Sequence, residues 1–462
     1  MSYVLSYRSI INYLEQPISI APLVVFRIAF GLLMLFSTIR YMAMGWVDTQ
    51  LINPSLHFSY YGFDWVNPLP GQWMYLVFVL MTVSAVAITL GAFYRLATAL
   101  FFMCFSYVEL IDITYYLNHY YFVSIVSFLL IFVPANSLFS VDAKRKPHIK
   151  SYTASLWTVG VFKLQIAIVY IYAGLAKINY DWLIKALPLS IWLPAKTSIP
   201  VIGWIFKFKA TAYIFSWLGM LFDTFIVFGL MWKKTRWLSY AAVVFFHTVT
   251  GILFQIGIFP VVMIFAVTIF FSASFHERLL NKLSVLIGGQ PLFVTDCDDE
   301  REVSKIQSPS TVFYFFLLMF FTFQVLFPWR YLLYSGKVFW TEEGYRFAWR
   351  VMLMEKAGTA TFYVKDGPDG REGSVINSQF LNMHQEKQMS MQPDLILQFA
   401  HYLEQHFLSK GMTDPQVRVE AYVTLNAGPA QQLIDSNIDL TQIEDGWRKK
   451  TWVKPYNASM NR

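Results

Sequence analysis

Runs of about twenty apolar residues, separated by short loops that carry charges, recur through residues 1–330. About twenty apolar residues in a helix cross the hydrocarbon core of a bilayer. Lipid cannot satisfy backbone N–H and C=O groups, so such runs must fold as helices. The whole chain is 56% hydrophobic and 14% charged, a composition typical of membrane proteins. The sequence therefore predicts an α-helical polytopic membrane domain over residues 1–330.

We expect about nine spans in this domain. They are 20–42, 73–93, 97–117, 122–134, 153–177, 211–232, two short spans within 237–272, and 312–327. Gly251, Gln255, Gly257 and Pro260 interrupt the run 237–272; if it is instead one kinked helix, the count is eight. Residues 275–287 repeat leucines at helical spacing and predict an amphipathic helix on the inner surface.

The distribution of basic residues sets the orientation. Lys and Arg concentrate at 144–146 and 233–236, whereas residues 43–72 contain none. Because cytoplasmic loops carry the excess of Lys and Arg, the first two segments lie inside and the third lies outside. With an inside N-terminus and nine spans, the C-terminal part lies outside. The membrane is a plasma or inner membrane in a prokaryote, or the endoplasmic reticulum in a eukaryote.

Residues 331–462 have a different character, with frequent charges and no span. Residues 347–365 and 416–426 alternate as strands do, and DGPDG at 366–370 is a hairpin turn signal. Residues 393–410 follow the pattern of an amphipathic helix. This region predicts a soluble, β-rich α+β domain of ordinary size on the extracytosolic side.

One charged residue stands near the end of an apolar helix, in QIAIVYIYAGLAKINYDW at 165–182. A Lys such as Lys177 costs roughly 3 kcal/mol inside hydrocarbon unless it is paired or loses its proton. It could reach the headgroups, with Asp181 one turn on as its partner. It could instead be a desolvated Lys that acts as a base. Ala173, Gly174 and Ala176 around it would let another backbone or a flat ligand approach closely.

The predicted topology places His119, Lys177 and His247, from three separate spans, near the outer face, with Asn118 beside His119. A lone membrane His is usually a packing residue, but convergence from three helices favours a site. Aromatic residues around a Lys, two His and an Asn suit a flat apolar molecule with polar ends, such as a hydroquinone. The Lys would deprotonate it, and the His and Asn would hold its oxygens.

Tyr170, Gln255 and Phe259 belong to the same apolar segments and are assigned to binding this ligand. No carboxylate cluster joins the two His, so no metal site is expected. The net charge of +7 is accounted for by loop residues, and no nucleic-acid motif is present. Cys104 lies in an apolar segment and Cys297 in an acidic loop, so no disulfide is expected.

Six collinear stretches resemble the vitamin K-dependent gamma-glutamyl carboxylase family. They are NHYYF at 118–122, SVDA at 140–143, the segment 165–182, FHTVTGILFQIGIFP at 246–260, KVFWTEEGYRFAWRVML at 337–353 and WRKKTWVKPY at 447–456. The resemblance covers nearly the whole chain. It implies that residues 1–330 are a transmembrane carboxylase and epoxidase domain, embedded in a lipid bilayer, and that 331–462 are the extracytosolic domain.

The resemblance also implies a reaction. The cofactor would be vitamin K hydroquinone (reduced menaquinone or phylloquinone), with O2 and CO2, and the substrate a glutamate-containing peptide or protein. Oxidation of the hydroquinone to its 2,3-epoxide supplies the strong base that removes a glutamate γ-hydrogen, and CO2 adds to the carbanion.

The family's residue roles carry over onto matching positions. Lys177 would match the base that deprotonates the hydroquinone, and His119 and Asn118 would stabilise the anion. His247 would match a functionally important His. The stretch where the substrate glutamate approaches would match three aromatic residues: Trp340, Tyr345 and Trp349.

The chain departs from the animal enzymes in four ways. Ala176 stands where they have a second Lys, no cysteine pair could link the two domains, the C-terminus is shorter, and Arg346 and Arg350 replace less basic residues. Two alternatives therefore stay open. One is an epoxidase without carboxylation. The other is a non-catalytic quinone or lipid binder, or a transporter, which the interrupted segment 237–272 would suit.

Overall fold

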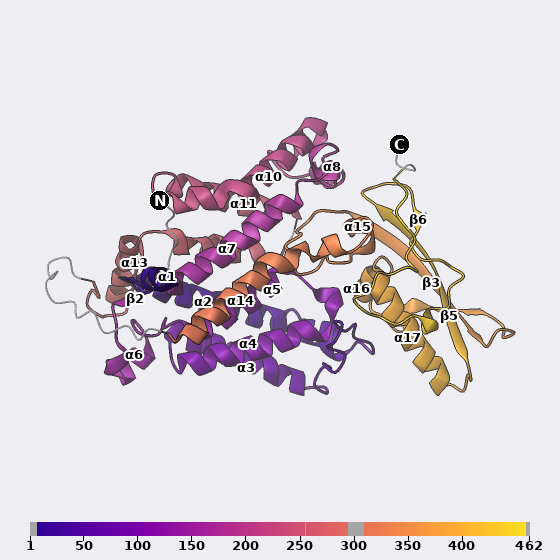
Figure 1. The fold of residues 1–462 in the computed structure, drawn as a ribbon, viewed down its shortest axis with the longest axis horizontal. Helices are drawn as coiled ribbons and strands as arrows, with labels where there is room; N and C mark the ends of the chain where they lie inside the picture. Colours follow the sequence, from indigo (N-terminus) through magenta and orange to yellow (C-terminus); the bar gives the residue numbers. More distant parts are fainter. Residues whose placement is uncertain (1–6, 255, 294–308, 459–462) are drawn as a thin grey trace.

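The computed structural model describes residues 7–254, 256–293 and 309–458. Within these residues, seven helices are long and apolar enough to cross a membrane. They are α2 (Ala21–Ala43), α3 (Trp73–Leu90), α4 (Tyr94–Ile111), α7 (Leu156–Ala176), α10 (Lys209–Met231), α11 (Arg236–Phe254), and α14 (Thr311–Leu326) with its continuation η7 (Phe327–Leu333). Figure 1 shows these helices as one bundle beside a smaller C-terminal region.

The two remaining expected spans are shorter. The helix α5 (Asn118–Phe132) has 15 residues and ends before Pro134, which is short of the roughly 20 that cross a bilayer. The run 237–272 is broken, as expected, into α11 and a second piece made of α12 (Phe259–Ala266) and η6 (Val267–Phe270). That piece and the next helix form one bent pair with a 114° angle, which would make the count of spans eight.

The end of the bundle farthest from the C-terminal region holds the short elements that join the spans. It contains α1 (Tyr7–Leu14), a two-stranded sheet of β1 (Pro17–Ser19) and β2 (Thr153–Ser155), α6 (Val141–Arg145), η3 (Pro147–Ile149) and α13 (Ala273–Leu286) (Figure 1). The helix α13 confirms the helix predicted at 275–287. The basic segment 144–146 lies at this end, as the orientation requires.

The opposite end of the bundle, which faces the C-terminal region in Figure 1, contains the short helices of the outer loops and of the entry to that region. They are η1 (Val47–Ile52), η2 (Ile113–Tyr115), α8 (Tyr180–Leu183), α9 (Leu189–Trp192), η4 (Leu193–Lys196), η5 (Gly203–Lys207) and α15 (Val338–Thr341). Asp112 accepts hydrogen bonds from Thr114 and from Gln385 of the C-terminal region. The Gln398 side chain pairs with both backbone groups of Ser59. These contacts fix the C-terminal region to the outer loops.

The C-terminal region is α+β, as predicted. Its sheet has the order β4-β3-β5-β6, all antiparallel: β4 (Gly373–Ser374), β3 (Lys356–Asp366), β5 (Pro415–Leu425) and β6 (Gln431–Gln432). The turn at 366–370 joins β3 to β4, which confirms the hairpin signal. The short helices η8 (Asn377–Gln379) and η9 (Leu440–Gln442) lie in its loops.

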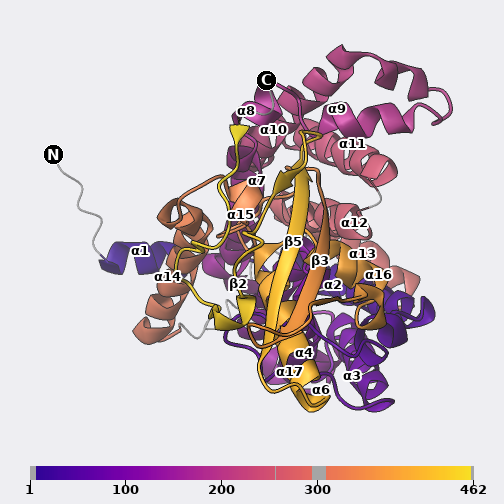
Figure 2. The ribbon, with the colours of Figure 1, turned by 90° about the vertical axis from the view of Figure 1, so that its right-hand side faces the viewer.

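One face of this sheet forms the core of the region. Along β5, alternate residues from Val417 to Leu425 are buried, whereas those between them are partly exposed or exposed. The helix α17 (Pro393–Ser409) packs against the buried face and confirms the helix predicted at 393–410. Figures 1 and 2 show α17 and α16 (Met383–Met389) between the sheet and the membrane bundle, with the sheet outermost.

The strand predicted over 347–365 begins only at Lys356. The preceding segment, 342–352, follows an irregular path in which four non-glycine residues have positive φ. They are Glu342, Phe347, Trp349 and Met352, with φ of 58°, 59°, 56° and 54°. Side chains with a Cβ rarely adopt this conformation, which costs of order 1–3 kcal/mol each. The alternating pattern was therefore wrong there, because the polar and apolar residues serve tertiary contacts and not two faces of a sheet.

Polar contacts hold this segment in place. The Arg346 guanidinium forms an ion pair with Asp394 at the start of α17 and donates a hydrogen bond to the Gln392 side chain. The backbone carbonyl oxygen of Arg346 accepts a hydrogen bond from the Arg330 guanidinium. Burial raises the pKa of Asp394, but the charges of Arg346 and Lys450 outweigh it, so that pKa lies well below its usual range.

Close packing of α7 on α10 depends on one glycine. A Cβ at Gly174 would lie 2.6 Å from the backbone N and 2.8 Å from the Cα of Thr224. This confirms that a small residue of α7 admits a neighbouring backbone. Gly160, in the same helix, has no atom within 4 Å of its Cβ position.

We expect Gly174→Ala to lower stability by about 1–3 kcal/mol, because an added methyl group would push α10 away from α7. Gly160→Ala should be neutral or stabilising by up to about 1 kcal/mol, because alanine favours an open helical position. The apparent thermal midpoint of purified protein in detergent, at one scan rate, measures both. Equal shifts in the two variants would contradict this account of the helix contact.

We expect Asp394→Asn to destabilise the protein at pH 7 by about 3 kcal/mol, near the low end for breaking a buried pair. The side chains of Arg346 and Asp394 are still 14% and 18% exposed. The pKa of Asp394 is lowered in the folded state, so its stabilisation is present above the unfolded value of about 3.9 and is lost as the pH falls below it.

The difference in thermal midpoint between Asp394→Asn and wild type should therefore be constant near neutral pH and shrink below about pH 4. Glu372→Gln, which removes one carboxylate from the exposed Arg418 pair, is the matched control. It should cost less than about 1 kcal/mol. A gap for Asp394→Asn that persists undiminished in acid would contradict the ion-pair explanation.

Candidate functional site

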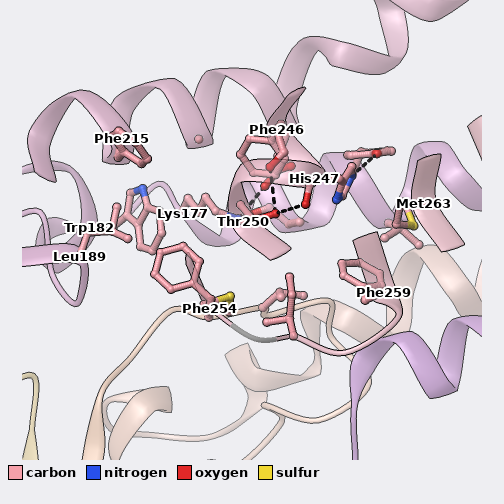
Figure 3. Close-up of a pocket in the computed structure, with 18 of the residues that line it drawn as sticks. Lys177, Trp182, Leu189, Phe215, Phe246, His247, Thr250, Phe254, Phe259 and Met263 are labelled. Atoms are coloured by element: carbon pink, nitrogen blue, oxygen red, sulfur yellow. Dashed lines mark hydrogen bonds and ion pairs between the residues drawn. The ribbon is translucent and has the colours of Figure 1, made fainter. Parts of the chain in front are cut away.

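An apolar cavity of about 100 Å³ lies between the outer halves of α7, α10 and α11, the start of α12 and residues 351–352. Its polar lining atoms belong to a small set of side chains. They are Tyr170 and Lys177 of the α7 segment, Asp223 of α10, and His247 and Thr250 of α11. Aromatic side chains supply much of the rest, including Trp182, Phe215, Phe246, Phe254 and Phe259 (Figure 3).

Lys177 is the C-cap residue of α7, and its side chain turns into the bundle and not toward the headgroups. Its Nζ lies 2.6 Å from Asp223 Oδ2 and 3.2 Å from the carbonyl oxygen of Ala173. Both side chains of the pair are only 7% exposed. The indole of Trp182 covers the ammonium, with Nζ 5.4 Å from the ring centroid. The charge is therefore desolvated and neutralised by a second buried charge.

The partner suggested by the sequence was wrong. Asp181 pairs instead with Lys337 at 2.6 Å and bonds Asn426. Sequence reasoning missed Asp223, although it stands inside a 23-residue apolar helix, where an ionisable residue marks a functional site by default. Recognising that signal would have supplied both the partner of Lys177 and a carboxylate for the site.

His247 is held by Tyr170. The tyrosine hydroxyl lies 2.7 Å from His247 Nε2, and His247 Nδ1 has no hydrogen-bond partner among the described residues. When the hydroxyl donates to Nε2, the proton of the neutral imidazole is on Nδ1. Nδ1 is then a donor available to an oxygen atom of a ligand. The predicted residues Lys177, His247 and Tyr170 thus line one cavity.

Phe259 also lines the cavity, and its ring lies between the two His residues assigned from the sequence. Its centroid is 5.9 Å from that of His247 and 5.3 Å from that of His119. His119 is buried in the first turn of α5 but is not part of the cavity lining. Gln255, the remaining residue assigned to the ligand, lies outside the described residues.

Asn118 also stands apart from the lining. Its Nδ2 donates to the carbonyl oxygen of Arg350 at 3.2 Å, and its Oδ1 accepts from Tyr116. The Tyr116 hydroxyl in turn accepts from the backbone N–H of Phe347. In this structure Asn118 therefore holds the irregular segment 342–352 against the start of α5.

The three aromatic residues assigned to the substrate lie around that segment and do not line the cavity. Trp340 and Trp349 are each 1% exposed. The Trp340 indole donates to the carbonyl oxygen of Lys454, and Trp349 stacks on Tyr121 with centroids 5.0 Å apart. Tyr345 packs edge-on to Phe339. The residues of the segment that do reach the cavity are Val351 and Met352.

The segment 342–352 in fact borders three hollows. Val351 and Met352 line the cavity beside Lys177. Ala348 and Arg350 line a groove of about 810 Å³ beside the end of α7. A third hollow, of about 370 Å³, is lined in part by Glu342, Glu343, Gly344, Arg346 and Phe347. Within the described residues, no three His, Cys, Asp or Glu side chains are grouped as a metal site.

Comparison with known families gives two matches that follow one another along the chain. Residues 15–275 match the HTTM domain, and residues 309–459 match the lumenal domain of vitamin K-dependent gamma-carboxylase. The second match includes α14 as well as the C-terminal region. No solved structure matches the chain.

The seven long apolar helices and these matches agree that the chain is an integral membrane protein. The HTTM match covers more than half of the chain, and the lumenal-domain match covers most of the remainder. The chain belongs to the vitamin K-dependent gamma-glutamyl carboxylase family.

Proposed function

We propose that this protein is a vitamin K hydroquinone-dependent gamma-glutamyl carboxylase, whose epoxidation and carboxylation site is the cavity beside Lys177. The observation that carries the proposal is the desolvated Lys177–Asp223 pair. It faces an aromatic cavity next to an oriented His, one ring nitrogen of which has no partner among the described residues. Strongly desolvated charges beside a mostly apolar pocket are a signature of acid–base sites.

The lining suits a hydroquinone chemically. Aromatic side chains offer faces for a flat ring, and Nδ1 of His247 and Nζ of Lys177 offer polar partners for oxygens. A cavity of about 150 Å³ holds a benzene ring, so a bicyclic ring needs more room than the present 100 Å³. Binding therefore requires the aromatic lining to move apart.

The bound hydroquinone, on reaction with O2, supplies a base stronger than any side chain, which is what removal of a glutamate γ-hydrogen needs. The task of Lys177 is to accept a proton from a ligand hydroxyl. In the ion pair Nζ already carries its proton, so that proton must first pass to Asp223 Oδ2 along the 2.6 Å hydrogen bond. The neutral amine can then take up the ligand proton.

His247 and the apolar wall have separate tasks. Nδ1 of His247 donates a hydrogen bond to a ligand oxygen, and Tyr170 keeps the ring in the tautomer that allows this. The buried aromatic side chains exclude water, which would otherwise quench a strong base. His119, packed on Phe259, supports that wall from behind.

The break between α11 and α12, which could have suggested a transporter, borders this cavity through Phe254, Ile256 and Phe259. A ligand site at this cavity thus explains why the helix is broken between α11 and α12, and no transport path is needed to explain it. Epoxidation without carboxylation remains the alternative that the assay must separate.

The test uses purified full-length protein with reduced vitamin K, a glutamyl pentapeptide and labelled bicarbonate, following epoxide and fixed carbon together. We expect both products from wild type, and neither from Lys177→Met, because the residue that accepts the ligand proton is gone. Epoxide without fixed carbon would mean an epoxidase alone. Neither product from folded wild-type protein would refute the proposal.

Lys177→Met also leaves Asp223 buried without a counter-charge, which costs about 3–5 kcal/mol. The double variant Lys177→Met/Asp223→Leu removes both charges and should recover the thermal midpoint, while activity stays absent. Activity that returns together with stability would show that the pair is structural only.

We expect Tyr170→Phe to lower kcat/KM for the hydroquinone about two- to thirteenfold, as expected for one net hydrogen bond of about 0.5–1.5 kcal/mol. The phenyl ring keeps the packing, but the orientation of His247 is lost. Tyr213→Phe, on an exposed face of α10, is the matched control and should leave kcat/KM unchanged. Equal effects in both variants would contradict the role of the Tyr170–His247 contact.

A further inference from the structure

The largest hollow beside the site is the groove of about 810 Å³ between the end of α7, η7 and the segment that enters the C-terminal region. Pockets of roughly 300–1,000 Å³ bury drug-sized ligands, so the groove has room for a short peptide. Its lining combines apolar residues, among them Leu175, Ile178 and Trp329, with polar and charged residues.

The charges of the groove are unbalanced. Its lining holds three cations, Lys185, Lys337 and Arg350, and one carboxylate, Asp181. Asp181 is already paired with Lys337 at 2.6 Å. Lys185 is exposed to solvent and lies over the ring of Tyr180. Arg350 is therefore the one cation of this lining that is both buried and without a carboxylate.

Arg350 is 8% exposed, which makes it an expensive charge to leave unpaired. Its guanidinium carbon lies 4.1 Å from the ring centroid of Tyr331 and 5.9 Å from that of Phe339. Among the described residues, its Nε has no hydrogen-bond partner and no carboxylate pairs with it. Stacking between rings fixes the plane of the guanidinium. The Tyr331 side chain also hydrogen-bonds to the guanidinium, and Nε remains available to a ligand.

The groove and the cavity beside Lys177 share their walls. Leu175, Ala176 and Ile178 line the groove, whereas Lys177 between them lines the cavity. On the other wall, Arg350 lines the groove and the next two residues line the cavity. A ligand held at Arg350 is thus separated from the proposed reaction site only by the end of α7 and the segment 348–352.

We propose that this groove docks the acidic peptide substrate and that Arg350 binds one of its glutamate carboxylates. The inference rests on the proposed function, because it assigns the substrate site of that reaction. A planar guanidinium matches a carboxylate through two parallel hydrogen bonds. A single buried cation suits one carboxylate better than a lipid phosphate, which favours clusters of cations.

The test measures binding without turnover. A fluorescein-labelled pentapeptide with two adjacent Glu residues, and its Gln counterpart, are titrated by fluorescence anisotropy against full-length protein in phosphatidylcholine nanodiscs. Wild type should bind the Glu peptide at least tenfold more tightly than the Gln peptide. Arg350→Gln should lose that preference, whereas Arg371→Gln, which removes an exposed charge from the same region, should keep it.

Equal affinity of wild type for the two peptides overturns the proposal, and this comparison does not depend on the folding of any variant. Preference that survives in Arg350→Gln also overturns it, provided that the thermal midpoint is unchanged. Arg350→Lys keeps the charge without the planar fork, and should bind with intermediate affinity.

A second arm repeats the titration with phosphatidylglycerol in the nanodiscs. If Arg350→Gln changes retention of that lipid and not peptide affinity, the groove is a lipid headgroup site and the proposal fails. The two proposals can fail separately. If peptide binding depends on Arg350 but the protein forms no epoxide, only the proposed activity is refuted. If the protein turns over substrate but peptide binding does not depend on Arg350, only this inference is refuted.

Discussion

The packing of the helices around the proposed site depends on a single buried ion pair, between Lys177 and Asp223. Two charges can remain inside a bilayer only if each neutralises the other at hydrogen-bond distance, here 2.6 Å. That distance requires α7 and α10 to lie nearly in contact, which the absence of a side chain at Gly174 permits. The aromatic cavity lies beside this pair and is lined by residues of α7, α10, α11 and α12.

Much of the fold was predictable because its causes are local in the sequence. Apolar runs of sufficient length predicted the long helices, and the interruption at 251–260 predicted the break between α11 and α12. Run length alone could not give the number of spans, because α5 has fewer residues than a bilayer needs and the α12 segment forms a bent pair with α13. The strand predicted from residue 347 was wrong. Polar and apolar residues alternate there as they do in a strand, but in 342–352 they make tertiary contacts in an irregular segment.

The site was predictable in part. Four residues assigned from the sequence, Tyr170, Lys177, His247 and Phe259, line one cavity, whereas His119 and Asn118 pack behind or beside it. Pairing partners could not be assigned because they depend on rotation of each helix about its own axis. Asp181 is closer to Lys177 in sequence, yet it points to Lys337, and Asp223 on another helix takes its place.

The irregular segment 342–352 has a consequence for the order in which ligands bind at this junction. One stretch of backbone, held in conformations that side chains rarely adopt, forms part of the wall of every hollow described at this junction. Such a wall cannot yield toward one occupant without changing the space left for the others. The hollows are therefore mechanically coupled through this segment, and occupation of one would alter ligand binding in the next.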